Sequence, residues 1–456
     1  MAIGSIENAV GQLAPTFSGE LLRPGSAGYD EARRVHNGLI DKRPALIARC
    51  RNVADIVDAV KLARQLELEI AVRGGGHNVA GRATVDGGLM IDLAPMKAIH
   101  VDPNIRTARA QGGATWKEFN RETQLYGLAT TGGVVGSTGI AGLTLGGGLG
   151  WLMPKYGMAL DNLLSAQLVM ADGRVLQASA NENPDLYWAI RGGGGNFGVA
   201  ASLEFRLHPV GPIVAGGLVA HPVQKAKDVL RFFRECAAAA TDETMLVGAL
   251  VPAPDGSGTK LAAIAACHCG RPEEAAAALK PIKEFGPPAM DAMGPIPYVA
   301  LNGMLDGGFP KGALNYWKSN FVPSLGDAAI NLAIEAFLEC PAPMGQIMFE
   351  HFHGASTRVG VSETAYALRS PGFNLLVLSQ WLEAKDTDRS IAWARKTYDA
   401  LQPFFGGSRY LNYLGDDEPG DAIRDAYGVN YERLRKIKSK YDPENVFHLN
   451  QNIKPT

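Results

Sequence analysis

The sequence predicts an α+β protein of two or three domains, and three observations lead to this fold class. The chain has 456 residues, of which 46% are hydrophobic and 20% charged, as is usual for soluble globular proteins with large cores. In the second half of the chain, candidate strands and helices alternate. The segment PAPDGSGTK (252–260) between two of these strands is typical of a hairpin, which favours an antiparallel sheet with helices on one face.

The first half begins with an amphipathic helix, which is followed by short strands. Asn52 is a plausible helix start, with Asp55 three residues later and an apolar stripe through residues 52–66. A hairpin over 163–179 turns at Asp172 and Gly173. Further helices are expected at 114–127 and 183–190, and strands at 68–73, 89–93, 98–102, 107–111 and 199–210.

The second half begins near 209–217, where glycine becomes less frequent and the helices become longer. Near the C-terminus a helix starts at 431 and ends at Asp442, because a residue that precedes proline disfavours the helical conformation. The other helices are expected at 223–239, 271–283, 325–338 and 387–404, and the strands at 244–252, 259–267, 345–353 and 373–382.

Charge, cysteine content and hydropathy exclude several classes of protein. The net charge of −2 without a long basic block excludes nucleic acid as the expected partner. The five cysteines, odd in number, and an N-terminus without a signal-peptide pattern predict a cytoplasmic protein. The 32 residues between Glu122 and Lys155 are uncharged, but ten are glycine, which is unfavourable in a lipid-facing helix. We therefore expect no membrane partner here, but a buried loop system whose main chain meets a large ligand.

Three glycine-rich segments precede residue 200, at 74–76, 132–150 and 191–198. Successive glycines leave backbone amides free to approach the anionic oxygens of a ligand. The third segment contains the spacing G-x-G-x-x-G, but a dinucleotide fingerprint follows a strand and opens a helix. This one follows a predicted helix and opens a strand, so a Rossmann fold is not expected. The three segments together predict a buried cofactor.

Four of the glycine-rich and neighbouring segments, with two near the C-terminus, form a distinctive set: AVRGGGHNVAG, GLATTGGVVGSTGIAGLTLGGGLGWL, KYGMALDNLLSAQLVMADGRVL, NPDLYWAIRGGGGNFGV, YLNY and YDPENVFHLNQNI. This set resembles the berberine bridge enzyme-like flavin oxidases of the vanillyl-alcohol oxidase superfamily, and is closest to their bacterial branch. The resemblance implies a PCMH-type FAD-binding domain of two subdomains over 1–208. It also implies a substrate-binding domain over 209–406 and a C-terminal segment, 407–456, that completes the FAD-binding domain.

The resemblance implies that FAD is the cofactor and that His77 carries it through one covalent bond to the 8α-methyl group. Many relatives form a second bond from a cysteine, but that position is Val135 here, and residues 51–235 contain no cysteine. The alternative for His77 is a packed histidine in a turn. Contacts to FAD are expected from Arg73, Gly74, Gly75, Gly76, His77, Asn78, Gly81, Val135, Thr138, Gly139, Gly142, Leu143, Gly148, Gly150, Asn162, Asn196, Gly198, Val199, Asn412, Asn450 and Asn452.

Tyr410 of YLNY matches a family tyrosine that lies close to the reacting carbon. A tyrosine with an ordinary pKa of about 10 is a poor base at neutral pH unless a neighbour lowers that pKa. Glu350, His353 and Asn374 are the candidates for such a neighbour. On a strand over 349–355, Glu350 and His353 lie on opposite faces, and which face lines the substrate site stays open.

Two positions depart from the plant members of the family. Leu376 stands where relatives carry a glutamate or glutamine, and Leu149 replaces a tyrosine in the GGGYG segment. These replacements predict a less polar substrate site than in the sugar-oxidising relatives. Thr138 lies at the position thought to govern access of oxygen, where its hydroxyl group either contacts the flavin or binds only backbone.

A metal site is not expected. The pairs Cys267 with Cys269 and His351 with His353 offer four ligands, but the C-x-C spacing is not that of a zinc knuckle. No feature of the sequence brings the two pairs together.

The sequence therefore predicts an FAD-dependent oxidase. It would transfer hydride to the flavin from a C–H bond next to a hydroxyl or amine group of a moderate-sized organic substrate, and dioxygen would then be reduced to hydrogen peroxide. A dehydrogenase with another electron acceptor and a catalytically silent flavin-binding protein are the alternatives. The expected partners are a small-molecule substrate and dioxygen, and an oligomer stays open.

Overall fold

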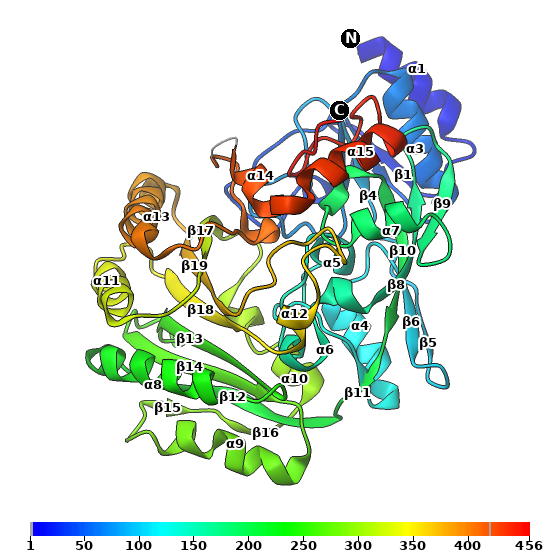
Figure 1. Ribbon diagram of the computed structural model, residues 1–456. Coiled ribbons are helices and arrows are strands. Elements are labelled where there is room, and N and C mark those ends of the chain that lie inside the picture. The colour runs from blue at the N-terminus through cyan, green and yellow to red at the C-terminus, as the bar shows by residue number, and fades with distance from the viewer. Residues whose placement is uncertain (1–2, 419–420) are drawn as a thin grey trace.

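The computed structural model describes residues 3–418 and 421–456, which form two lobes around three main sheets. In Figure 1 the first 200 residues and the C-terminal helices share one lobe, while residues from about 213 to 404 form the other. Both chain ends lie in the first lobe. The architecture confirms the predicted α+β class.

A small sheet with parallel strands begins the first lobe. Its order is β1 (Glu20–Leu22), β2 (Leu46–Arg49), β4 (Leu89–Asp92) and β3 (Ile70–Arg73), and only β1 is antiparallel to its neighbour. The predicted helix, α3 (Val53–Gln65), connects β2 to β3, and the Asn52 side chain accepts the Asp55 N–H at its start. The buried residues of α3 pack against this sheet. The first glycine segment follows β3 and therefore starts from a well-packed strand.

The second sheet of the first lobe is antiparallel. Its order is β5 (Ile99–Asp102), β6 (Thr107–Gln111), β10 (Val199–Arg206), β8 (Leu163–Val169) and β9 (Val175–Ser179), and a short pair joins β7 (Leu128–Ala129) to β11 (His208–Pro209). The predicted hairpin over 163–179 is confirmed as β8 and β9. The core of this sheet includes Trp116, Phe119 and Phe205, together with Leu434 from the C-terminal helix. The end of the chain thus packs into the core that its beginning forms.

The second lobe is built on one large antiparallel sheet. Its order is β15 (Met290–Asp291), β12 (Ile213–Pro222), β14 (Lys260–His268), β13 (Thr244–Pro252), β18 (Gln346–Phe352), β19 (Gly372–Trp381) and β17 (Leu314–Val322), with β16 (Gly294–Pro297) paired to β12. The predicted hairpin is confirmed, because Pro252 pairs with Lys260. Helices α8 (Ala226–Ala239), α11 (Asp327–Leu338) and α13 (Thr387–Leu401) cover one face (Figure 1), as expected.

Strands β12 and β17 of this sheet were not expected from the sequence. Two adjacent glycines, Gly216 and Gly217, interrupt the apolar pattern of β12, and β17 contains the polar run Lys318, Ser319 and Asn320. In the folded chain these three polar side chains are buried and hydrogen-bonded. Hydrogen-bond partners from distant segments therefore stabilise β17 as a strand, although its sequence lacks a regular alternation of apolar and polar residues.

The remaining α-helices of the described residues are short or lie at the edges of the lobes. Within residues 3–418 and 421–456, no helix combines the length and the apolar character that crossing a bilayer requires. These helices are α1 (Ile3–Leu13), α2 (Tyr29–Ala32), α4 (Trp116–Thr123), α5 (Ile140–Leu145), α6 (Met153–Tyr156), α7 (Pro184–Ile190), α9 (Pro272–Glu284), α10 (Tyr298–Asn302), α12 (Ala355–Arg358), α14 (Asp421–Tyr427) and α15 (Tyr431–Tyr441).

Candidate active site

The first two glycine segments lie against each other, main chain to main chain. Gly75 follows β3 and Gly139 precedes α5, and a β-carbon on either glycine would collide with the backbone of the other. Arg73, at the end of β3, is buried, and its Nε lies 2.9 Å from Oδ1 of Asp92. This ion pair fixes the strand end from which the first glycine segment starts, so Arg73 supports the loop and does not line the cavity.

His77 stands where the two glycine segments meet. Its Nε2 lies 2.8 Å from the Ser137 hydroxyl, its Nδ1 lies 3.4 Å from the Thr138 hydroxyl, and its ring stacks on His36 at 3.9 Å. Burial, with a smaller contribution from His36, lowers the pKa of His77 to about 3. The imidazole is therefore neutral at pH 7 and keeps a nitrogen lone pair for attack on an electrophile.

One large cavity runs between the two lobes and is lined by the glycine segments, the C-terminal tail and the large sheet. The volume open to the centres of water molecules is about 310 Å³, whereas a single buried water needs only about 10–15 Å³ on that measure. Of the residues predicted to contact FAD, the cavity is lined by Gly74, Gly75, Gly76, His77, Asn78, Val135, Thr138, Gly139, Gly142, Leu143, Gly150, Asn412 and Asn450.

The other predicted contacts are not among the residues that line the cavity, and two of them hold the loops around it. Asn196 donates to the carbonyl groups of Gly193 and Gln451, and its side-chain oxygen accepts the Ile453 N–H, which joins the third glycine segment to the tail. Asn162 donates to the carbonyl groups of residues 156 and 158. With Arg73, the predicted contacts that do not line the cavity are Gly81, Gly148, Asn162, Asn196, Gly198, Val199 and Asn452.

The residues around the first lobe's part of the cavity fit a dinucleotide such as FAD. A β-carbon on Gly142 or Gly195 would meet no atom within 4 Å, so these backbones leave open space beside the cavity. Buried polar atoms without a partner in the described chain include Nε of Arg82 and the side-chain oxygens of Asn450 and Asn452. Arg82, Gly194 and Gly195 were not predicted as contacts, although Gly194 and Gly195 belong to the third glycine segment.

The large sheet supplies the second wall of the cavity, and this wall is mostly apolar. On β18 the side chains at alternate positions, Gln346, Met348 and Glu350, line the cavity. Met348 lies between Ala249 of β13 and Leu376 of β19 in the sheet register. Leu376 also lines the cavity, which supports the expected apolar site.

Glu350 lies on the cavity face of β18, whereas His351 lies on the other face and His353 follows the end of the strand. Oε2 of Glu350 accepts from Asn374 at 2.6 Å, and Oε1 accepts from the Tyr413 hydroxyl at 3.1 Å. Burial raises the pKa of Glu350 to about 7, although both hydrogen bonds oppose this rise. Glu350 is therefore a carboxyl group able to exchange a proton near neutral pH.

Tyr410 has other partners than the sequence suggested. Its hydroxyl oxygen accepts the backbone N–H groups of Gly148 and Leu149, at 3.0 and 3.3 Å, and the Asn412 side-chain amide at 2.9 Å. Burial raises the pKa of Tyr410 to about 12; the three donors oppose this rise, and the charge of Glu350 adds to it. The expectation that Glu350, His353 or Asn374 lowers this pKa is therefore wrong.

The glycine run at 146–148 makes room for Tyr410 and its donors. A β-carbon on Gly146 would collide with the Asn412 carboxamide, and one on Gly147 would lie 2.8 Å from the Tyr410 ring. The Asn412 amide also donates to the Leu143 carbonyl at 3.0 Å, which fixes its orientation. The segment GGGLG (146–150) thus holds the Tyr410 oxygen through two main-chain donors.

His353 does not line the cavity. It stacks on His351 at 3.9 Å, and its Nε2 lies 3.4 Å from the Thr241 carbonyl. Cys267 and Cys269 are buried on or beside β14. Among residues 3–418 and 421–456, no group of three or more potential ligands is arranged for a metal ion.

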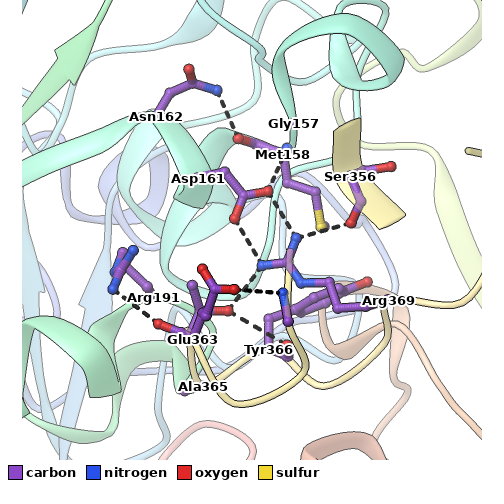
Figure 2. A network of polar contacts seen from close by, with 12 residues as sticks. Gly157, Met158, Asp161, Asn162, Arg191, Ser356, Glu363, Ala365, Tyr366 and Arg369 are labelled. Atoms are coloured by element: carbon purple, nitrogen blue, oxygen red, sulfur yellow. Dashed lines mark hydrogen bonds and ion pairs between the residues drawn. The ribbon is translucent and has the colours of Figure 1, made fainter. Parts of the chain in front are cut away.

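A buried ion pair joins the two lobes behind Tyr410. Figure 2 shows the Arg369 guanidinium facing the Asp161 carboxylate, with both nitrogen–oxygen distances at 2.8 Å. Arg369 also lies over the Tyr366 ring at 5.2 Å, and Tyr366 packs edge-on against Tyr410 at 6.3 Å. This network holds the loop before β19 against the first lobe.

Comparisons with known proteins give the family context of this site. Residues 44–179 match the family described as FAD binding domain, and residues 409–454 match the one described as berberine and berberine like. The chain is 31% identical to (R)-6-hydroxynicotine oxidase of Paenarthrobacter nicotinovorans, with 96% of this chain and 97% of that protein aligned. It is 30% identical to an FAD-linked oxidoreductase of Dictyostelium discoideum, over 98% of this chain and 97% of that one.

Solved structures show the same architecture. The crystal structure of 6-hydroxy-D-nicotine oxidase from Arthrobacter nicotinovorans has a TM-score of 0.88 at 29% identity and covers 97% of this chain and 99% of its own. A glucooligosaccharide oxidase from Acremonium strictum, with a 6-S-cysteinyl, 8α-N1-histidyl FAD, has a TM-score of 0.86 at 24% identity, with 99% of each chain covered. The second likeness concerns the fold alone.

Proposed function

Because the chain belongs to the berberine bridge enzyme-like family of FAD-linked oxidoreductases, we propose that it is an oxidase. Its substrate is a moderate-sized, mostly apolar organic molecule with a C–H bond next to a hydroxyl or amine group. One observation carries the proposal: a single cavity is lined both by the glycine segments with His77 and by Tyr410 and Glu350. When bound, FAD accepts the hydride from that C–H bond and passes the electrons to dioxygen, which yields hydrogen peroxide.

The chain itself orients the substrate and receives its proton. The apolar wall around Met348 and Leu376 excludes water from the reacting bond. Glu350, with a pKa of about 7, takes up a proton from the substrate near neutral pH. The three hydrogen-bond donors to the Tyr410 oxygen stabilise its phenolate form, and this makes Tyr410 a second group able to accept a proton from the substrate.

The proposal includes one covalent bond between His77 and the flavin. The neutral imidazole of His77, which lines the cavity beside Ser137, supports it. Val135 cannot supply the second, cysteinyl bond, so one attachment is expected. Acid-precipitated protein should stay yellow, and His77→Ala should give a colourless pellet. A yellow pellet from the variant would show that another residue forms the covalent bond to the flavin.

Anaerobic mixing tests the oxidase activity. A substrate should bleach the flavin under argon, and admission of air should restore the colour rapidly with formation of peroxide. Recovery that is no faster in air than under argon would reject dioxygen as the acceptor and indicate a dehydrogenase. We also propose a cytoplasmic location, since all five cysteines are free thiols; cell fractionation checks it.

A further inference from the structure

Glu350 is a buried carboxylate without a cation of its own. Within residues 3–418 and 421–456, no lysine, arginine or histidine forms an ion pair with it, and it is the one acidic side chain among the cavity-lining residues. Its neighbours are Val247 across β13, Asn374 across β19, and Tyr410 and Tyr413 from the tail. The two tyrosines are neutral near pH 7, because burial raises both pKa values.

The two hydrogen bonds of Glu350 fix the orientation of its carboxylate and leave both oxygens able to accept a hydrogen bond from a ligand. Asn374 donates to one oxygen, and the Ser319 hydroxyl donates to the Asn374 side-chain oxygen at 3.3 Å, which holds the amide with its NH₂ group towards Glu350. Tyr413 donates to the other oxygen. Each carboxylate oxygen has a further lone pair, so a ligand in the cavity meets two unshared acceptor sites.

The surroundings of Glu350 suit a molecule with one cationic end and an apolar body. An unpaired buried carboxylate is costly, and a cation that enters the cavity removes this cost. The aromatic ring of Tyr413 packs edge-on against the rings of Tyr410 and Trp317, at 4.8 and 5.7 Å, and aromatic faces attract alkylammonium groups. Next along β18 lies Met348, which packs in one apolar cluster with Leu376.

We propose that the substrate is an amine, bound through its ammonium group to Glu350 with its apolar body over Met348 and Leu376. This inference rests on the proposed oxidase function and assigns its substrate class. The ammonium nitrogen loses one proton to the Glu350 carboxylate, which gives a neutral amine and a neutral carboxylic acid. The freed nitrogen lone pair then assists the departure of hydride from the adjacent carbon to the oxidised FAD.

Binding to the oxidised holoenzyme tests the assignment, measured by rapid mixing under argon before the flavin is reduced. The probes are matched pairs of arylalkyl amines and alcohols, with benzylamine and benzyl alcohol as the first pair, and perturbation of the flavin spectrum reports the Kd. We expect at least one amine to bind about tenfold or more tightly than its alcohol. The inference is overturned if every alcohol binds as tightly as its amine, or if no amine binds.

Variants and pH assign this preference to Glu350. Glu350→Gln should remove the amine preference, Glu350→Asp should retain most of it, and the exposed control Glu383→Gln should leave it unchanged. The ammonium ion needs the carboxylate, so amine affinity for the wild type should fall about tenfold per pH unit below pH 7 and calorimetry near pH 7 should show proton release on binding. Alcohol affinity should not follow this pattern.

A Glu350→Gln variant that keeps the amine preference, or wild-type binding without pH dependence, overturns the proposal. The wild-type measurements decide even if the variant does not fold. Rapid flavin reduction by alcohols alone would reject the amine and keep the oxidase, whereas no flavin reduction by any probe that binds would count against the oxidase itself.

Discussion

The two walls of the cavity are built from different parts of the chain. The wall in the first lobe is largely glycine main chain, in which Gly75 and Gly139 touch backbone to backbone. The wall in the second lobe consists of side chains on the large sheet, such as Met348, Glu350 and Leu376. Main-chain packing tolerates only glycine, whereas a side chain on a strand can change without loss of the strand. The first wall is therefore suited to a constant cofactor and the second to a variable substrate.

The largest effect should come from the ion pair that joins the two lobes behind these walls. Arg369→Leu leaves Asp161 as an uncompensated, mostly buried charge, so the free energy of unfolding should fall by about 3–5 kcal/mol. Denaturant unfolding of the apoprotein measures this change. The matched control, Arg358→Leu, breaks the exposed pair with Asp242 and should cost far less, because solvent screens that pair. Equal losses in the two variants would contradict a special role for the buried pair.

Glu350→Gln tests the charge in the wall formed by the second lobe, through its effect on the free energy of unfolding. The raised pKa means that the folded state favours the protonated acid, so stability is lost as pH rises from the unfolded value of about 4.5 to about 7. The variant lacks this loss and should be more stable than the wild type by up to about 3 kcal/mol at pH 8, with no gain at pH 4. Urea unfolding at the two pH values measures the difference. A gain that does not depend on pH would reject the titration of Glu350 as its cause.

Asn412→Leu tests the point at which the two walls meet. It removes one of the three donors to the Tyr410 oxygen, and a hydrogen bond to a charged group contributes about 1.5–3 kcal/mol. If the phenolate forms during turnover, flavin reduction should slow about 10- to 100-fold, and its rise with pH should move to higher pH. Tyr410→Phe, which lacks the hydroxyl, should lose this pH dependence. An unchanged pH profile in Asn412→Leu would show that Tyr410 stays protonated.

The smallest effect is expected at Gly142 in the wall formed by the first lobe, here called the cofactor wall. This glycine lies inside helix α5 and beside open space, so Gly142→Ala should stabilise the apoprotein by about 0.5–1 kcal/mol. The added methyl group should at the same time lower the amount of flavin retained. Thermal unfolding and the flavin-to-protein absorbance ratio measure the two effects. At Gly139 the same substitution should destabilise the apoprotein, because its β-carbon meets the backbone of Gly75.

The contrast between the walls also explains which predictions from the sequence held. The α+β class and the antiparallel sheet were predictable, since the alternation of helices with strands such as β13, β18 and β19, and the hairpin at 252–260, are local signals. Strand β17 was not predictable, because its polar residues are satisfied by partners more than fifty positions away, such as Asn374 for Ser319. The domain boundaries at 208 and 406 stay predictions.

The candidate site, like the fold, was predictable only in part. The glycine segments and His77 could be found because their residue types are unusual at that spacing. The partners of Tyr410 could not, since two of its three donors are backbone amides, at 148 and 149, which every residue except proline carries. No side-chain pattern marks them.

The sequence by itself determined the cofactor wall, because close packing of main chains requires glycine at given positions and leaves few alternatives. Only the tertiary structure decided what Glu350 and Tyr410 do. Whether a carboxyl or phenol group is charged depends on its burial and on the donors around it, and for both residues the cavity wall brings these donors together from segments far apart in the chain.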